Sequence, residues 1–155
     1  MRAISINHVS IHAHDLEESA AFYEQLLGME RIPAPTFAFP VAWLRLGRQQ
    51  LHLFVRSGAQ APQFHHVGLS VDDFDAVYWR AREERLRDDS AFFSAMYELP
   101  DGSVQMYLRD PADNLVEVDW PDASTLASTT LAEMVPLDSM ARQEGDAAVA
   151  TLYHS

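Results

Sequence analysis

The chain has 155 residues, 48% of them hydrophobic, which suits one compact domain or two small modules. Its formal net charge of −12 excludes nucleic acid and anionic membrane surfaces as expected partners, because both require a basic face. No apolar run comes near the ~20 residues of a membrane span, and the absence of cysteine leaves only nitrogen and oxygen atoms as metal ligands.

The first part of the chain predicts a strand followed by a helix. Apolar and polar residues alternate from Ile4 to His12, as in a strand with one buried face. The helix begins at Asp15, with Glu18 in the position that closes a capping box, and ends at Gly28. Three more strands are expected, at residues 30–33, 41–46 and 49–55, with a hairpin turn at 46–48.

The second part of the chain repeats this β-α-β-β-β pattern. His8 and His66 are separated by 58 positions, and so are Asp15 and Asp73, which indicates an internal duplication. The repeat predicts a strand at 64–71, a helix from 73 to about 87, and strands near 92–99, 103–109 and 114–120.

The module boundaries follow from this repeat. We expect a first module at residues 1–58, a second at 63–121, and a small-residue linker at 57–62. Residues 122–155 predict a tail with one short helix around 139–153, which packs on the surface or on a partner subunit or is partly disordered. Since the first residues lead straight into a strand without the pattern of a secretory signal, the expected location is cytoplasmic.

Strand periodicity gives each sheet one aliphatic face and one polar face, because successive side chains point to opposite sides. The polar faces carry His8, His52, His66 and Glu117. In the duplication, His8 corresponds to His66 and His52 corresponds to Glu117. Two copies facing each other would bring these side chains to one site where a metal ion can hold a substrate. Further candidates to line this site are Ser10, Trp43 and Phe54, although core packing is the simpler interpretation of the two aromatic rings.

Several stretches of the chain resemble the vicinal oxygen chelate superfamily, which includes glyoxalase I, methylmalonyl-CoA epimerase, extradiol dioxygenases and bleomycin-binding proteins. The resemblance implies an α+β fold in which paired β-α-β-β-β modules form a U-shaped sheet cup, and it implies a homodimer. It covers Ser5–Trp120 and rests on residues 7–11, 15–19, 22–23, 27–29, 51–53, 65–71 and 109–117.

The resemblance also implies one divalent metal per site, with His8, His66 and Glu117 as ligands. His52 occupies the position of a fourth ligand, where related proteins usually have Glu or Gln, so it either binds through nitrogen or supports the other ligands. Imidazole and carboxylate donors accept Fe, Mn, Ni, Zn or Co. They leave positions open for a substrate that chelates through two adjacent oxygens.

Tyr107 is expected to face the same cup, since it alternates with the apolar residues of its strand. The resemblance implies a substrate contact there, as in extradiol dioxygenases. Glu98, nine residues earlier, stands where those enzymes have a histidine, which argues against ring cleavage and makes Glu98 a candidate base instead.

Two classes of function remain open at this point. The first is a metal-dependent enzyme acting on a small substrate, either extradiol-dioxygenase-like or a glyoxalase-like lyase or isomerase. The second is a metal-free binding protein of the bleomycin-resistance type, which would gain from the acidic charge. The retained His8, His66 and Glu117 favour the enzyme.

Overall fold

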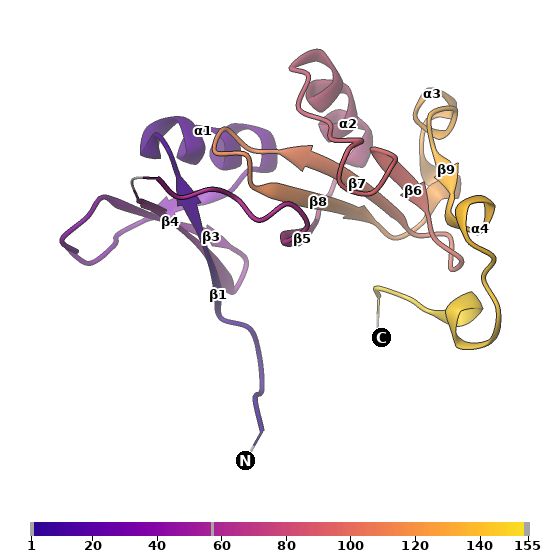
Figure 1. Cartoon of the computed structure of the whole chain (residues 1–155), viewed down its shortest axis with the longest axis horizontal. Helices are drawn as coiled ribbons and strands as arrows, with labels where there is room; N and C mark the ends of the chain where they lie inside the picture. The colour runs from indigo at the N-terminus through magenta and orange to yellow at the C-terminus, as the bar shows by residue number, and fades with distance from the viewer. Residues whose placement is uncertain (1, 57, 154–155) are drawn as a thin grey trace. The chain divides into compact units, whose positions relative to one another are not determined.

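The computed structural model describes residues 2–56 and 58–153, which form two compact units. The first unit contains residues 1–65 together with Asp110–Asn114, and the second contains residues 66–109 and 115–155. Each unit has its own sheet (Figure 1). Among the described residues, no helix is long and apolar enough to cross a membrane.

The first unit is a four-stranded sheet with one helix. The strand order is β1-β4-β3-β2, in which β1 and β4 are parallel and the other neighbours are antiparallel. The elements are β1 (His8–Ala13), α1 (Leu16–Leu27), β2 (Glu30–Ile32), β3 (Val41–Leu46) and β4 (Gln49–Val55).

Local sequence signals set the ends of α1. Asp15 caps its first turn by accepting a 2.9 Å hydrogen bond from the backbone N–H of Glu18. Gly28 ends the helix in the left-handed conformation, at φ 64°, which glycine adopts without steric cost. The helix buries Ala20 and Tyr23 and packs against β3 and β4. Both predicted helix ends are therefore confirmed.

The second unit repeats the same topology and extends it by one strand. Its order is β5-β8-β7-β6-β9, and β5 runs parallel to β8 as β1 does to β4. The predicted α+β fold with repeated β-α-β-β-β motifs is thus confirmed. The elements are β5 (His66–Ser70), α2 (Phe74–Glu83), β6 (Met96–Glu98), β7 (Val104–Arg109), β8 (Leu115–Trp120) and β9 (Val135–Pro136).

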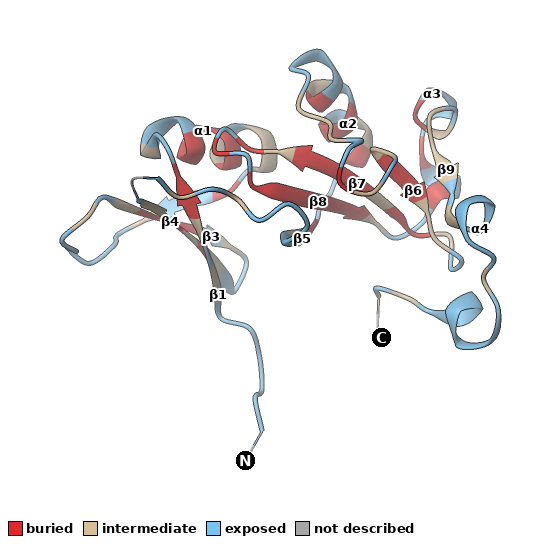
Figure 2. Cartoon of the chain, in the orientation of Figure 1, coloured by how far each residue is buried: buried red, intermediate tan, exposed pale blue. Residues whose placement is uncertain are grey.

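The interior of the second unit lies around β7 and β8, which are almost completely buried in Figure 2. Helix α2 packs against β8 with a stripe of apolar side chains at helical spacing. Its buried residues are Phe74, Val77, Tyr78 and Ala81.

The predicted start of the first strand and the predicted end of the second helix are wrong. The first strand was expected from Ile4, but β1 begins at His8, and Ile4 and Ile6 are 87% and 70% exposed. The parallel partner β4 begins only at Gln49, so residues 4–6 have no strand beside them. The second helix was expected to reach Arg87 but ends at Glu83, because Arg85 takes a left-handed conformation at φ 58°.

The strand expected at 92–99 is reduced to β6. The Asp88 side chain accepts hydrogen bonds from the backbone N–H groups of Ser90 and Ala91, which holds a turn there. Phe93 has φ 68° and cannot continue an extended strand. The chain becomes regular only at Met96.

The single tail helix expected around 139–153 is also wrong. Gly145, with φ 59°, interrupts the helical pattern and separates two short pieces. The tail contains η1 (Ala123–Thr125), α3 (Ser128–Leu131), β9, α4 (Leu137–Met140) and η2 (Gly145–Val149).

The tail contacts several elements of the second unit in turn. Near α2, Asp75 accepts hydrogen bonds from the Ala127 N–H, at 2.9 Å, and from the Thr130 hydroxyl. The chain then adds β9 to the edge of the sheet, parallel to β6. Its end lies on the side of the sheet opposite α2 (Figure 1), where the hydroxyls of Tyr153 and Ser70 are 3.4 Å apart. The tail therefore contacts α2, the β6 edge of the sheet and β5.

Candidate functional site

In the first unit, two of the predicted ligands form a ring stack. His8 on β1 and His52 on β4 lie on one face of the sheet, with ring centroids 4.4 Å apart and planes inclined by 16°. Trp43 pairs directly with His52 across β3 and β4 and stacks on it, with centroids 4.2 Å apart and planes within 5°. The His52 ring is therefore held between His8 and Trp43.

Polar neighbours orient both imidazoles. Gln50 Oε1 lies 2.8 Å from His52 Nε2, and Asn7 Oδ1 lies 2.6 Å from His8 Nδ1. Burial, and then the proximity of His8, lower the pKa of His52 below its ordinary value. His52 is consequently neutral at pH 7, which is the form of imidazole that binds metals.

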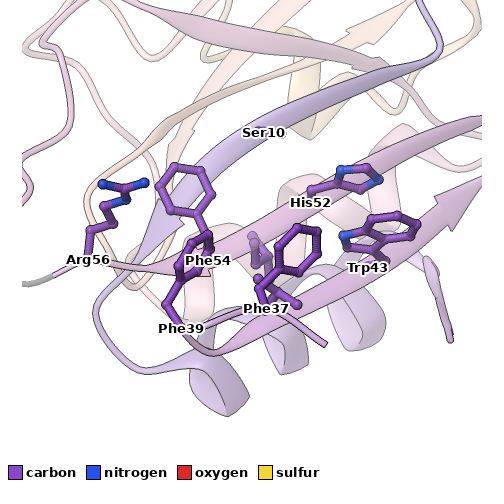
Figure 3. A pocket seen from close by; sticks show the side chains of 9 residues that line it. Ser10, Phe37, Phe39, Trp43, His52, Phe54 and Arg56 are labelled. Carbon is purple, nitrogen blue, oxygen red and sulfur yellow. The ribbon is translucent and has the colours of Figure 1, made fainter. Parts of the chain in front are cut away.

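An aromatic pocket of about 220 Å³ adjoins this ring stack (Figure 3). The three sequence candidates for substrate contacts, Ser10, Trp43 and Phe54, all line it. The other lining residues are Phe37, Phe39, Val41, His52, Leu53 and Arg56.

In the second unit, the other two predicted ligands are close to each other. His66 Nε2 on β5 lies 3.4 Å from Glu117 Oε2 on β8. Gly68 pairs with Glu117 across the two strands, and a Cβ atom at this glycine would come within 3.1 Å of Asp119 Oδ2 and 3.3 Å of Glu117 Oε1. A larger residue here would be tight against both carboxylates, which would have to move by a few tenths of an ångström.

Tyr107 belongs to the same cluster. It pairs with Glu117 across β7 and β8, and its ring lies edge-on to that of His66, with centroids 6.0 Å apart. The Tyr107 hydroxyl is 3.4 Å from Gln105 Oε1. Burial, and then the charge of Glu117, raise the pKa of Tyr107 well above its ordinary value, so the phenol keeps its proton.

Asp119 is a member of this cluster that the sequence analysis did not single out. It follows Glu117 by two positions and therefore points to the same face, which strand alternation alone would have indicated. Asp119 is 8% exposed, and its Oδ1 has no hydrogen-bond partner among the described residues. Burial, and then the charge of Glu117, raise the pKa of Asp119 to about 8.

Glu98 is not part of this cluster, and His12 is buried. Glu98 pairs with Val104 across β6 and β7, so its side chain lies on the face opposite that of Tyr107 and is not brought to this cluster. His12 is only 7% exposed, and its Nε2 has no partner among the described residues. The burial follows from its place at the inner end of β1, next to the fully buried Ala13.

The donor set suits a divalent metal ion. Two ligand atoms that each lie ~2.1 Å from one metal ion are ~3.0 Å apart at a right angle and ~3.4 Å apart at a tetrahedral angle. His66 Nε2 and Glu117 Oε2 are 3.4 Å apart, at the upper end of this range. Within either unit, the described residues form no group of three His, Asp or Glu side chains placed to hold a metal. The predicted set is divided, with His8 and His52 in the first unit and His66 and Glu117 in the second.

The repeated motif and these polar clusters define a class of protein with paired β-α-β-β-β modules. The chain belongs to the Glyoxalase/Bleomycin resistance protein/Dioxygenase superfamily, whose family model matches residues 5–118.

Comparison with individual proteins gives consistent but distant similarity. The chain is 29% identical over 96 residues to human mitochondrial methylmalonyl-CoA epimerase, covering 53% of this chain and 54% of that protein. It therefore spans about half the length of this relative. Among solved structures, it resembles a putative glyoxalase family protein from Bacillus anthracis, with TM-score 0.61 and 26% identity over 77% of this chain and 98% of that one. A lactoylglutathione lyase from Agrobacterium tumefaciens gives TM-score 0.58 and 26% identity, over 77% and 95%.

Proposed function

We propose that the protein is a divalent-metal-dependent enzyme whose small substrate chelates the metal through two adjacent oxygens. His8, His66 and Glu117 are the proposed ligands, and His52 is the proposed fourth. The observation that carries this proposal is the pairing of His66 with Glu117 at 3.4 Å on the polar face of the second sheet. Membership of a family that contains an epimerase and a lyase supports it.

The metal would supply Lewis-acid stabilisation of the negative charge that develops on the substrate oxygens. The surrounding side chains have separate tasks. Tyr107, whose phenol stays protonated, can donate a hydrogen bond to a substrate oxygen beside Glu117. Gly68 keeps the space beside both carboxylates open. The neutral His52 ring is held in place by its neighbours before substrate arrives.

The reaction we favour is proton transfer at a carbon next to the chelating oxygens, as in a lyase or isomerase. The similarity to an epimerase and to a lactoylglutathione lyase supports this choice. An extradiol-type dioxygenase is the second candidate, and the contact of Tyr107 with His66 is the observation in its favour. We infer a cytoplasmic homodimer, in which the two ligand pairs meet either within one chain or between two chains.

Substrate trials with isotopic water distinguish these reactions. The metal-loaded protein would be incubated in D2O with methylmalonyl-CoA and with hemithioacetals, and separately with catechols and dioxygen. Deuterium incorporation into a thioester or hemithioacetal, followed by mass spectrometry, is the expected result. Oxygen uptake with a catechol would identify the dioxygenase instead. Inactivity in all three trials would contradict the proposal that the protein is an enzyme. Binding of bleomycin without metal would then indicate a metal-free binding protein.

Tyr107→Phe tests the proposed role of the phenol. Because it removes only a hydroxyl beside Glu117, we expect turnover to fall by about 10- to 100-fold while metal content stays unchanged. Tyr97→Phe is the matched control, since Tyr97 packs against Tyr107 in the same cluster and its hydroxyl binds the Phe92 carbonyl instead. Equal rates for the two variants would make Tyr107 a packing residue.

A further inference from the structure

The aromatic pocket of the first unit has a built-in polarity. In Figure 3, Arg56 lies at one end, His52 and Trp43 lie at the other, and phenylalanine rings lie between them. The rings are in contact with one another, since Phe37 and Phe39 stack at 5.7 Å and Phe39 meets Phe54 edge-on at 6.4 Å. The pocket therefore has an apolar middle and two chemically different ends.

These rings are not buried in the core. Phe37 is 46% exposed, and Phe39, Trp43 and Phe54 are half-buried. Leaving several large apolar side chains in contact with water loses the free energy that their burial would provide. A group of partly exposed aromatic side chains that lines a pocket is therefore a candidate ligand-binding surface.

The volume suits one aromatic ring. A cavity of ~150 Å³ lined by apolar side chains is enough to bind benzene, and this pocket has about 220 Å³. The faces of Phe39 and Phe54 offer the offset and edge-on contacts that aromatic pairs prefer. The remaining space accommodates a small substituent on the ring.

Arg56 gives its end of the pocket a positive charge. Its guanidinium carbon lies 5.2 Å from the Phe39 ring centre and 6.0 Å from that of Phe54. In the described part of the chain it has no carboxylate partner, although the protein carries 23 Asp and Glu residues against 11 Lys and Arg. A guanidinium that rests on ring faces keeps its N–H edge available for a planar anion.

We propose that this pocket binds a small aromatic carboxylate, with its ring packed against the phenylalanine rings that line the pocket and its carboxylate paired with Arg56. This deepens the proposed function and rests on it only in one respect: a substrate held this way would present its chelating oxygens at the His52 end. The substrate class would then be an aromatic acid with two adjacent oxygens on the part of the molecule away from the carboxylate.

The test uses metal-free protein, so that failure of the metal proposal would not affect it. Binding of phenylacetate, of its uncharged isostere phenylacetamide, and of acetate would be measured by NMR titration of the backbone amides. We expect phenylacetate to shift amides of residues 37–56 and to bind roughly fivefold more tightly than phenylacetamide, with no binding of acetate.

Variants separate the two contributions. Arg56→Gln should abolish the preference for phenylacetate over phenylacetamide, and Phe54→Leu should weaken both by about fivefold. Arg48→Gln, in the turn between β3 and β4, is the control for a general loss of positive charge and should leave the preference unchanged. Equal binding of the two compounds to the wild type, or a preference that survives Arg56→Gln, would overturn the assignment of Arg56. If neither phenylacetate nor phenylacetamide binds, the proposal that this pocket is a ligand-binding site is wrong.

Discussion

Asp110 shows how one buried residue holds a loop of the first unit in place. Its carboxylate is 4% exposed and accepts hydrogen bonds from the Tyr23 hydroxyl at 2.9 Å and from the backbone N–H groups of Ala112 and Asn114 at 2.9 and 2.8 Å. The Asn114 amide also donates to Asp110 and to the His12 carbonyl. Such a network is stabilising only while every member is paired.

Asp110→Asn should therefore be costly. The new amide cannot accept all of these hydrogen bonds, and a buried donor without a partner is expensive, so we expect the free energy of unfolding to fall by about 2–3 kcal/mol. Urea denaturation measures this change. Asp113→Asn is the control in the same loop, because Asp113 is exposed and its φ of 65° is one that asparagine tolerates. Equal stability of the two variants would contradict the role of the network.

Asp88 makes a pH-dependent contribution. Burial acts to raise the pKa of this carboxyl, but hydrogen bonds from the Ala91 N–H, the Arg109 guanidinium and Ser90 outweigh it, and the pKa is lowered from 3.8. The folded state therefore favours the ionised form. The resulting stabilisation is present above the unfolded pKa of about 3.9 and is lost as the pH falls through the folded pKa.

Asp88→Asn should reveal this contribution. We expect the variant to be less stable than the wild type by about 1–2 kcal/mol at pH 7, because it loses charge-assisted hydrogen bonds, and the difference should shrink below pH 4. Thermal unfolding across this pH range is the measurement. The exposed neighbour Asp89 gives the control variant Asp89→Asn. A difference that persists unchanged at pH 2 would contradict the electrostatic explanation.

At the scale of elements, the tail is the part that sequence patterns described least well. Asp73 caps α2, whereas Asp75, in the first turn of the same helix, binds the tail at Ala127 and Thr130. Further along, Glu133 pairs with Arg82 and Arg87. Caps and turns depend on neighbouring residues and can be predicted from spacing. These contacts join residues about 50 positions apart and have no local signature.

Asp75→Asn should loosen the tail without unfolding the sheet. It weakens the acceptors of the Ala127 N–H and the Thr130 hydroxyl, so amides of residues 127–136 should exchange with deuterium faster, by about 5- to 10-fold. Exchange in β7 and β8 should stay unchanged. Asp72→Asn, at an exposed position before the same helix, is the control. Unaltered exchange in the tail would show that β9 and the Glu133 ion pairs suffice to hold it.

For the whole molecule, the repeated motif made the fold predictable. Hydrophobic alternation located most strands, and the constant spacing between His8 and His66 exposed the duplication, because both depend on residues close in sequence or on a fixed period. Side-chain surroundings were less accessible. The burial of His12 and the direction of Glu98 depend on strand pairings and packing that a single sequence does not specify.

The central claim is that His8, His66 and Glu117 hold a divalent metal. It is tested most directly by elemental analysis of protein purified anaerobically without chelator, as wild type and as His8→Ala and Glu117→Ala. His14→Ala is the control, since His14 is exposed and its contacts are with the Ala59 carbonyl and the His12 ring rather than with a proposed ligand. We predict about one metal per chain in the wild type and in His14→Ala, and its loss from the other two variants. Full occupancy in His8→Ala or Glu117→Ala, or a wild type that binds no metal after reconstitution, would contradict the claim.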